Sequence, residues 1–362
     1  MRKIKVGITH GDINGVGYEV ILKTFQDEAM FDICTPIVYG SPKIATFHRK
    51  AIDVQTNFSV RDSAAQADEH GLTLVNCFGE EEIKVDFAQA TSEAGKAAYV
   101  SLEKAMEEYK QGLFDVLVTA PINKFNIQGE GFSFPGHTEY IENRVGDGSK
   151  AMMILMRDNL RVALVTTHYP ISEVAQHISR ETLTEKIQIL NNTLKRDFAI
   201  EKPRIAVLGL NPHCGDGGVL GNEEKEIIAP VVEELFGTGI CCFGPYPADG
   251  FFGSGNYEHF DAILAMYHDQ GLAPFKLLAG DEGVNYTAGL PIIRTSPAHG
   301  TAYDIAGKGM ADENSFRHAV YAAIDIARHR RNYDIAHAHP LRRQYFEKRD
   351  DSDKLKLDES ED

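Results

Sequence analysis

The chain has 362 residues, 43% of them hydrophobic and 25% charged, which is an ordinary composition for a globular protein of one or two domains. Its formal net charge of −16 argues against nucleic acid as a partner, because the phosphates would be repelled. Five cysteines without a CxxC pair, no signal-peptide pattern and no long apolar run lead us to expect a cytoplasmic protein that does not enter a membrane.

The first third of the chain alternates strand-like and helix-like patterns, and residues 50–90 are its least regular part. A helix in which apolar residues recur at spacings of three and four closes this part. The expected elements are, in chain order, a strand at Ile4–Thr9, a glycine-containing loop at 11–17, a helix from about Tyr18, a strand at Pro36–Tyr39, a helix beginning at Pro42, the helix Ala94–Gln111 and a strand at Asp115–Ala120.

The rest of the chain continues the alternation, which predicts an α/β architecture with a mostly parallel sheet. A tight turn joins the first two strands of this part. The expected elements are the strands Met152–Met156 and Arg161–Thr167, helices at Ile171–Ile178 and Thr182–Phe198, the strand Ile205–Gly209, a glycine-rich stretch at 214–221, a helix at Glu223–Phe236, a buried strand from Phe260, and a last helix at Ser315–Arg328.

Three of the apolar runs end in a histidine, namely His168, His213 and His268. In open α/β sheets ligands bind beyond the carboxyl ends of the strands. Three imidazoles at such ends could converge on one divalent ion and leave positions open for substrate. A single histidine at a strand end is usually an ordinary polar residue, but three in the same context favour a metal site. Asp269 and Gln270 could orient an imidazole there.

Further polar residues of the chain could bind an anion. A Gly-His-Thr turn at His137 and Thr138 presents a backbone N–H, a hydroxyl and an imidazole, although Thr138 could simply cap a helix. Lys276, Asn285 and Arg294 follow at nine-residue intervals, and Arg294 is an odd buried charge unless an anion pairs with it. The alternative is that these three are unrelated surface residues.

The chain contains neither a GxGxxG that opens a βαβ unit nor a GxxxxGK[ST] motif, so a standard Rossmann or P-loop nucleotide site is not supported. The polar, glycine-rich stretch from His299 to Gly309 is either a long connection or a ligand-binding loop. Its length and its few apolar anchors favour the second interpretation.

Seven ordered motifs together resemble the PdxA family of 4-hydroxythreonine-4-phosphate dehydrogenases, from Gly7 to about Arg328. The departures from the family pattern are Ile13 and Tyr18 in the first loop and Cys214-Gly-Asp216 after His213. The motifs are Thr9-His-Gly-Asp12 with Gly15-Val-Gly, Ala120-Pro-Ile-Asn-Lys124, Gly136-His-Thr-Glu139, Leu210-Asn-Pro-His213, Tyr267-His-Asp-Gln-Gly271, Gly289-Leu-Pro-Ile-Ile-Arg294 and His299-Gly-Thr-Ala302.

The resemblance implies an isocitrate/isopropylmalate-dehydrogenase-like fold with two α/β/α domains and a central cleft. We expect a discontinuous first domain of residues 1–127 and 272–346, a second domain of residues 128–271, and a charged, disordered tail at 347–362. It also implies a homodimer whose metal site takes ligands from both chains.

The resemblance assigns roles to individual residues. The implied metal ligands are His168, His213 and His268, for one ion of zinc, cobalt, magnesium or manganese. The implied substrate-binding residues are His137, Thr138, Lys276, Asn285 and Arg294. Lys276 and Asp249 are the candidate catalytic residues, although Asp249 could be a plain turn residue. The implied residues for NAD or NADP are Asp12, His299, Gly300, Ala302 and Asp312.

The activity so implied is oxidation of 4-phosphooxy-L-threonine followed by decarboxylation to 3-amino-2-oxopropyl phosphate, in pyridoxal 5′-phosphate biosynthesis. Three other interpretations stay open. The substrate could be a sugar-acid phosphate such as erythronate or threonate 4-phosphate. A three-histidine site could instead activate water in a metallohydrolase. The chain could also be a non-catalytic module that binds a metal or a phosphate.

Overall fold

The computed structural model describes residues 2–79, 83–129 and 131–339. The charged tail expected at 347–362 lies outside these residues. The α/β architecture expected from the sequence is confirmed. In the described part of the chain, no helix combines the length and the apolar character that a membrane crossing requires.

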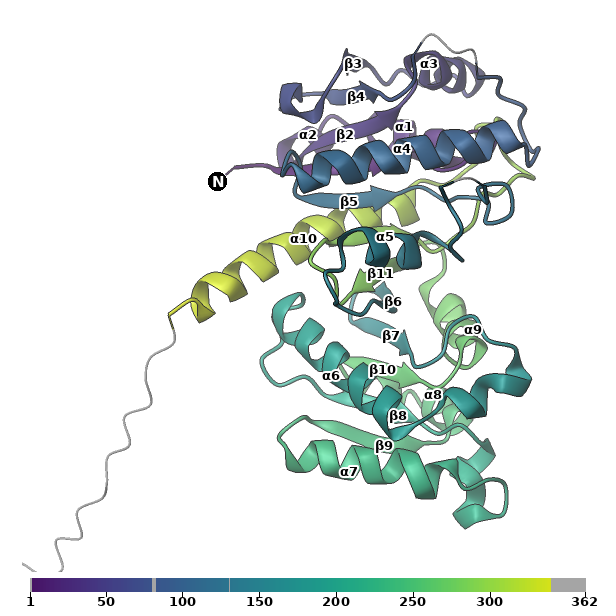
Figure 1. Ribbon diagram of the computed structural model, residues 1–362, viewed down its shortest axis with the longest axis vertical. Helices are drawn as coiled ribbons and strands as arrows, with labels where there is room; N and C mark the ends of the chain where they lie inside the picture. The colour runs from purple at the N-terminus through teal and green to yellow at the C-terminus, as the bar shows by residue number, and fades with distance from the viewer. Residues whose placement is uncertain (1, 80–82, 130, 340–362) are drawn as a thin grey trace, which may run out of the picture.

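A single twelve-stranded sheet forms the centre of the molecule and runs along its long axis (Figure 1). The strands at its upper end come from the first part of the chain, and those at its lower end come from the middle part. In spatial order they are β3 (Phe58–Arg61), β4 (Leu72–Asn76), β2 (Cys34–Gly40), β1 (Ile4–Thr9), β5 (Val116–Thr119), β12 (Arg294–Pro297), β11 (Val284–Ala288), β6 (Met152–Arg157), β7 (Leu160–Leu164), β10 (Ala262–Ala265), β8 (Ile205–Leu208) and β9 (Cys242–Tyr246).

The sheet is parallel at both ends and antiparallel in the middle. β11 pairs antiparallel with both β12 and β6, and β6 forms the expected hairpin with β7. Because β11 and β6 are hydrogen-bonded neighbours, the two expected domains share one sheet. The expected boundary after residue 271 falls inside a helix, α9 (His268–Ala279), and the division into two domains stays a proposal.

Helices cover the sheet, and α10 crosses the middle of the molecule in Figure 1. Side-chain oxygens of Ser41, Thr91 and Ser179 cap α3, α4 and α6, where they accept a hydrogen bond from a backbone N–H of the first turn. Apart from α9, the α-helices of the described residues are α1 (Gly17–Thr24), α2 (Met30–Ile33), α3 (Pro42–Ala51), α4 (Ser92–Lys110), α5 (His137–Val145), α6 (Arg180–Arg196), α7 (Ala229–Gly237), α8 (Ala248–Gly253) and α10 (Asn314–His337), with 3-10 turns at Ala64–Gln66, Ile171–His177, Pro212–Gly218 and Asn256–His259 and a π-helix at Glu224–Ile228.

Three strands that precede the candidate histidines lie side by side. β10 pairs parallel with β7 on one side and with β8 on the other. Parallel neighbours end at the same edge of a sheet, so the segments that carry His168, His213 and His268 all leave from one edge. In Figure 1 this is the right-hand side, toward which the arrowheads of β5 and β7 point and where α9 lies.

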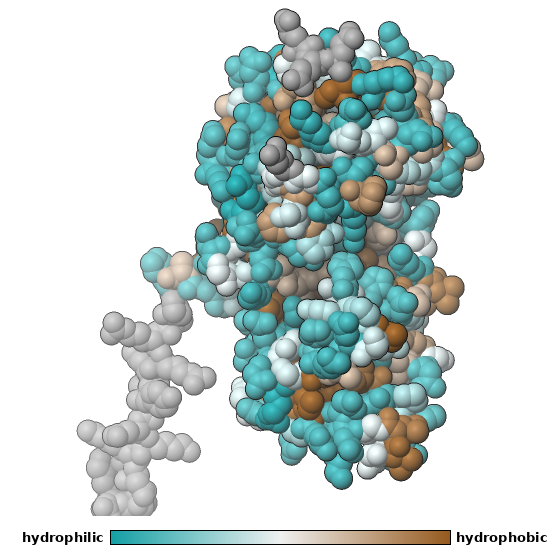
Figure 2. All heavy atoms as spheres, turned by 45° about the vertical axis from the view of Figure 1, so that its right-hand side comes forward, coloured by the Kyte–Doolittle hydropathy of each residue, from teal (hydrophilic) through white to brown (hydrophobic). Residues whose placement is uncertain are grey.

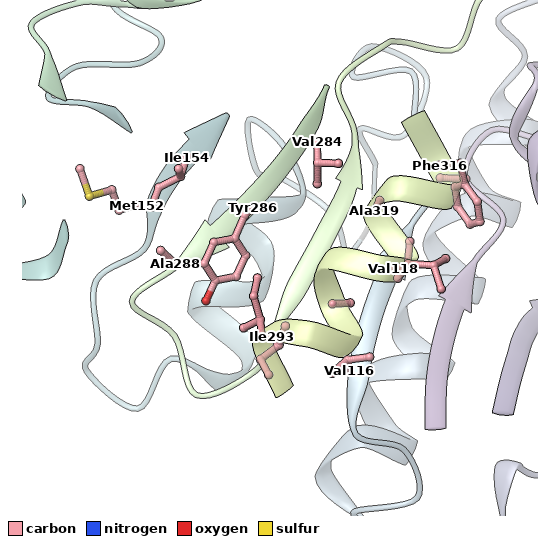
Figure 3. Close-up of a cluster of buried hydrophobic side chains, with 14 of the residues drawn as sticks. Val116, Val118, Met152, Ile154, Val284, Tyr286, Ala288, Ile293, Phe316 and Ala319 are labelled. Atoms are coloured by element: carbon pink, nitrogen blue, oxygen red, sulfur yellow. The ribbon is translucent and has the colours of Figure 1, made fainter. Parts of the chain in front are cut away.

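The middle of the sheet packs against α10 through a continuous apolar core. Val116 and Val118 of β5, Tyr286 of β11 and Phe316 of α10 belong to this core and are almost completely buried (Figure 3). The core holds the central strands against one helix, and these strands carry Asn285 and Arg294 at the candidate site.

A buried ion pair joins α10 to the end of α6. Nε and Nη2 of Arg330 donate to the carboxylate of Asp197 at 2.8 and 3.0 Å, and the hydroxyl of Tyr286 donates to the same carboxylate at 2.5 Å. Nη1 of Arg330 also donates to the carbonyl oxygen of Pro291 at 2.6 Å. This network of hydrogen bonds therefore connects α6, α10 and β11.

We predict that Arg330→Ala lowers the free energy of unfolding by about 3–5 kcal/mol, because it leaves the carboxylate of Asp197 buried without its countercharge. Urea unfolding of the variant and the wild type measures this. Arg328→Ala is the control, since Arg328 is exposed and pairs only with Asp325, and its loss should be within about 0.5 kcal/mol. Equal losses in the two variants would contradict the role given to the buried pair.

Candidate active site

One cavity beside the central strands gathers most of the residues that the sequence singles out. It has a volume of 290 Å³ and lies between the ends of β5, β6, β11 and β12, helix α5 and helix α9. The predicted residues that line it are His137, Thr138, His168, His268, Lys276, Asn285, Arg294, His299 and Gly300. We call it the substrate cavity.

Arg294 is a buried positive charge in the wall of the substrate cavity. Its side chain is 3% exposed, and its guanidinium donates to the hydroxyls of Thr119 and Thr287 at 2.6–3.2 Å. Among the described residues no carboxylate oxygen lies within ion-pair distance of it. Burial lowers the pKa of Arg294 to about 10, so the group is still charged at neutral pH. Such a site suits a phosphate, which would supply the missing countercharge.

Helix α5 begins at the same cavity with an open first turn. Its N-cap residue is Gly136, and no side chain caps the helix, so the alternative in which Thr138 is the cap is wrong. His137 and Thr138 are the first two residues of α5, where unpaired N–H groups attract anions. Burial, and then the charges of Arg294 and Lys124, hold the pKa of His137 well below its usual value. His137 is therefore neutral and can donate to a phosphate from only one ring nitrogen.

Lys276 and Asn285 complete the polar wall. Lys276 lies on α9, and Asn285 lies on β11 beside β12. The side-chain oxygen of Asn285 is buried and has no hydrogen-bond partner among the described residues. A buried polar atom without a partner is costly, which indicates that a ligand completes this site.

His168 and His268 lie together, with ring centroids 6.2 Å apart. Nδ1 of His268 is 2.7 Å from a carboxylate oxygen of Asp269, so Asp269 orients this ring as expected. Gln270 does not orient an imidazole. Its side-chain oxygen accepts a hydrogen bond from the N–H of Met266, and its amide nitrogen donates to the carbonyl oxygen of Gly209. Gln270 therefore connects the ends of β10 and β8. Burial, with contributions from Lys124 and His268, lowers the pKa of His168, which favours the neutral form that binds metals.

His213 does not lie with the other two histidines. It lines a separate cavity of 520 Å³ together with Asp249, Tyr267 and Gln270. Asp249 is therefore placed beside His213 rather than beside Lys276. Among the described residues of a single chain, no group of three or more histidine, cysteine or acidic side chains is arranged to hold a metal ion.

The backbone explains the position of His213. Five consecutive residues from His213 to Gly217 have φ between 45° and 76°, which is a left-handed turn. The carboxylate of Glu224 anchors it by accepting from the N–H groups of Leu210 and Asn211 at 2.7 and 2.6 Å. Such a run is strained for the non-glycine residues, and strain of this kind is concentrated at functional sites.

Two charged residues of the substrate cavity were given no role from the sequence. Lys124 donates to Nε2 of His168 at 3.4 Å, and Oε1 of Glu139 lies 4.0 Å from Nδ1 of the same ring. Both belong to motifs that carry the family resemblance, but the residues around them in the sequence do not indicate that either side chain contacts His168.

A second cavity, of 360 Å³, adjoins the first. Lys276, Ala298 and His299 line both cavities. Three of the five residues expected to bind the nucleotide, His299, Ala302 and Asp312, line the second cavity, whereas Gly300 lines only the substrate cavity. We call the second cavity the nucleotide cavity.

Asp12 lines neither cavity. It is 1% exposed, and Oδ2 accepts hydrogen bonds from the hydroxyl of Tyr303 at 2.7 Å and from the side-chain amide of Asn126 at 2.8 Å. The contact of Asp12 with a nucleotide stays a prediction. Through Tyr303, Asp12 fixes the loop that carries His299 and Ala302.

The chain is similar to known proteins over most of its length. Residues 32–323 match the family model described as "Pyridoxal phosphate biosynthetic protein PdxA". The chain is 65% identical over 356 residues to a 4-hydroxythreonine-4-phosphate dehydrogenase of Bacteroides thetaiotaomicron, covering 98% of each chain. It is 38% identical to a protein of Oceanobacillus iheyensis provisionally named D-threonate 4-phosphate dehydrogenase, covering 90% of this chain and 98% of that one.

Solved structures show the same fold. A crystal structure of 4-hydroxythreonine-4-phosphate dehydrogenase from Klebsiella pneumoniae superimposes with a TM-score of 0.77 at 31% identity, covering 90% of this chain and 98% of that one. One from Burkholderia phymatum has a TM-score of 0.73 at 37% identity, with coverage of 90% and 99%.

We predict that Arg294→Met abolishes phosphate binding without destabilising the free protein, because it removes a buried charge that has no countercharge. In thermal unfolding, phosphate at a hundred times its Kd should stabilise the wild type by about 2.7 kcal/mol and the variant not at all. The control is Arg180→Met, at an exposed arginine paired with Glu234, which should keep the full effect. Persistent stabilisation of Arg294→Met by phosphate would rule out this site.

Proposed function

The chain belongs to the PdxA family, and on this premise we propose that it oxidises 4-phosphooxy-L-threonine with NAD or NADP and decarboxylates it to 3-amino-2-oxopropyl phosphate, in pyridoxal 5′-phosphate biosynthesis. One observation carries the proposal. A buried arginine that has no countercharge among the described residues, the open end of α5 and two neighbouring histidines line the same cavity, beside a second cavity lined by three of the residues expected to bind the nucleotide.

The phosphate of the substrate is the anchor. The phosphate pairs with Arg294 and accepts hydrogen bonds from the N–H groups at the start of α5. It also contacts Lys276 and Asn285. Holding one end of the substrate fixes the carbon that carries the hydroxyl relative to His168 and His268. Positioning of this kind supplies a large part of the rate enhancement in many enzymes.

The two imidazoles of one chain fit part of a divalent metal site. The rings of His168 and His268 lie with their centroids 6.2 Å apart, and Asp269 fixes the orientation of one ring. A divalent ion bound there would act as a Lewis acid toward the substrate hydroxyl and toward the oxygen of the β-keto acid that forms by its oxidation. Lys124, beside His168, is placed to move a proton at that oxygen.

A nicotinamide cofactor in the nucleotide cavity would be the electron acceptor. A nicotinamide bound next to Lys276 and His299 would accept the hydride from the carbon that bears the hydroxyl. The hydroxyl proton leaves at the same time. Loss of carbon dioxide then breaks the bond to the carboxyl carbon, and a proton replaces it.

The position of His213 supports a homodimer in which this residue completes the metal site of the partner. Three exposed apolar residues, Phe125, Tyr169 and Leu277, each come directly after a residue of the substrate cavity. An apolar rim around a polar cavity is typical of a surface that another protein covers. The face drawn in Figure 2 is mostly hydrophilic, with hydrophobic side chains in separate clusters.

Other activities explain fewer of these features. A metallohydrolase or a simple binding module would have no use for a nucleotide cavity that shares its wall with the substrate cavity. A dehydrogenase for a sugar-acid phosphate remains the nearest alternative, because it would use the same phosphate site, metal site and nucleotide. We expect all of these steps to take place in the cytoplasm.

The direct test is formation of NADH by the purified protein supplied with 4-phosphooxy-L-threonine, NAD and a divalent metal. His213→Ala should lose turnover by at least about a thousandfold, together with its bound metal, because one of three protein ligands is gone. Absorbance of NADH and metal analysis measure the two effects. Full turnover by the wild type in the presence of a chelator would contradict the metal site, and hydrolysis without NADH would favour the metallohydrolase.

Mixing two inactive variants tests whether the site is shared. If His213 serves the partner's site, a dimer of one His213→Ala chain and one His268→Ala chain contains one intact site. Random mixing should then restore about a quarter of the wild-type activity. A mixture of His168→Ala with His268→Ala is the control and should stay inactive, because those two residues serve the same site. No recovery in the first mixture would rule out the shared arrangement.

A further inference from the structure

One wall of the nucleotide cavity is a segment without regular structure. Residues 298–313, all of which the structure describes, contain neither helix nor strand and connect β12 to α10. We call this segment the nucleotide loop. Ala302, Gly307 and Gly309 have φ between 46° and 71°, so its backbone turns sharply at three positions. Such a segment depends on hydrogen bonds from neighbouring elements to keep one conformation. The residues of the loop that line the cavity are Ala298, His299, Ala302, Ile305, Ala311 and Asp312.

Helix α1 and the residues just before it contact the nucleotide loop at two places. Near the start of the loop, the N–H of Val16 donates to the carbonyl oxygen of Thr301 at 3.1 Å. A Cβ on Gly15 would lie 2.7 Å from the same oxygen, so a glycine is needed for this close approach. Near the end of the loop, the contacts come from the side chains of Glu19 and Lys23.

Glu19 and Lys23 form an ion pair that also binds the backbone of the loop. Nζ of Lys23 donates to Oε1 of Glu19 at 2.9 Å. The same Nζ donates to the carbonyl oxygens of Gly309 and Ala311 at 2.9 and 2.6 Å. The N–H of Ala311 donates to Oε1 of Glu19 at 2.8 Å. The pair therefore holds both backbone polar groups of Ala311, and Ala311 and the following Asp312 line the nucleotide cavity.

This ion pair is better suited to fixing a conformation than to adding stability. The side chain of Glu19 is completely buried, and its Oε2 has no hydrogen-bond partner among the described residues. Desolvation of a carboxylate is costly, and an unpaired oxygen leaves part of that cost unrecovered. Charge-assisted hydrogen bonds are nevertheless stronger than neutral ones, and three of the four in this cluster end on the loop backbone.

We propose that Glu19 and Lys23 are positioning residues for the nucleotide, because they hold residues 309–312 in the conformation that the nucleotide binds. This inference rests on the proposed function, which places the nucleotide in this cavity. Neither side chain is among the residues that line the cavity, so both act through the backbone of Ala311 and Asp312. Loss of the pair should let the loop adopt other conformations, and the apparent Kd then rises in inverse proportion to the fraction that can bind.

Lys23→Met tests the proposal, because it removes every hydrogen bond that Nζ donates. If the binding conformation falls to about a tenth of the population, the Kd for the nucleotide rises about tenfold. Calorimetry with NAD and with NADP measures this, and the nucleotide that the wild type binds more tightly serves for all variants. Inorganic phosphate, which we expect to bind at Arg294 in the substrate cavity, should bind the variant and the wild type equally.

Lys104→Met is the matched control. Lys104 pairs with Glu108 on α4 at the same spacing of four residues, and again the carboxylate is buried and the lysine is partly exposed. Neither residue of this second pair lines the nucleotide cavity or the substrate cavity. Lys104→Met should therefore bind the nucleotide like the wild type, even where it unfolds at a lower temperature.

Two further variants complete the set. Glu19→Gln keeps an oxygen that can accept from Ala311 and Lys23, so its Kd for the nucleotide should rise only about threefold. Lys23→Gln repeats the main test with a polar side chain, and thermal unfolding establishes that each variant is folded. Unchanged nucleotide affinity in the folded Lys23 variants, an equal loss in Lys104→Met, a parallel loss of phosphate binding, or no binding of either nucleotide by the wild type would overturn the proposal.

These binding measurements do not depend on turnover. If the predicted pattern is found but the wild type forms no reduced nucleotide from 4-phosphooxy-L-threonine, the proposed function fails and the positioning role stands. If reduced nucleotide forms but the pattern is absent, the positioning role fails alone. In the active enzyme Lys23→Met should raise KM for the nucleotide about tenfold and leave kcat nearly unchanged, because the bound nucleotide itself restores the loop conformation.

Discussion

The guanidinium of Arg294 is a full positive charge that donates to two hydroxyl groups and has no carboxylate partner in the part of the chain that the structure describes. Desolvation of such a group costs several kcal/mol, and an anionic ligand is what recovers that cost. The same charge, together with burial, keeps His137 neutral. The uncapped start of α5 lies in the same cavity, so two independent features of the fold, this helix end and the charge of Arg294, favour one bound phosphate. The reacting part of the site is arranged around that anchor.

The sequence predicts the buried strands better than the segments that connect them. Buried parallel strands are continuous apolar runs, and this is why β7, β8 and β10 and their common edge could be foreseen. Helix α9 escaped prediction because it contains Pro274 and Gly271, which break the helical pattern. Strand β12, which pairs parallel with β5 and antiparallel with β11, is four residues long, and its arginine, threonine and serine give no apolar signal.

The residues of the candidate site differ in the same way: some could be predicted from the sequence, and others could not. Arg294 and His268 could be found because each is chemically unusual where it stands in the sequence. Glu139 and Lys124 meet His168 only because α5 and the loop after β5 pack against the end of β7, and that packing depends on contacts distant in sequence. The position of His213 depends on a left-handed turn anchored by Glu224, and a periodic pattern contains no information about such a turn.

The hydrogen bonds of Asp12 give the two cavities a physical connection. Tyr303, in the loop that lines the nucleotide cavity, donates to Asp12 and accepts from the side-chain amide of Asn123 at 3.1 Å. Asn123 is the residue before Lys124, which lies in the substrate cavity. Tyr303 therefore joins the loop of the nucleotide cavity directly to the segment that carries Lys124, and the two cavities share this hydrogen-bonded connection as well as the wall formed by Lys276, Ala298 and His299.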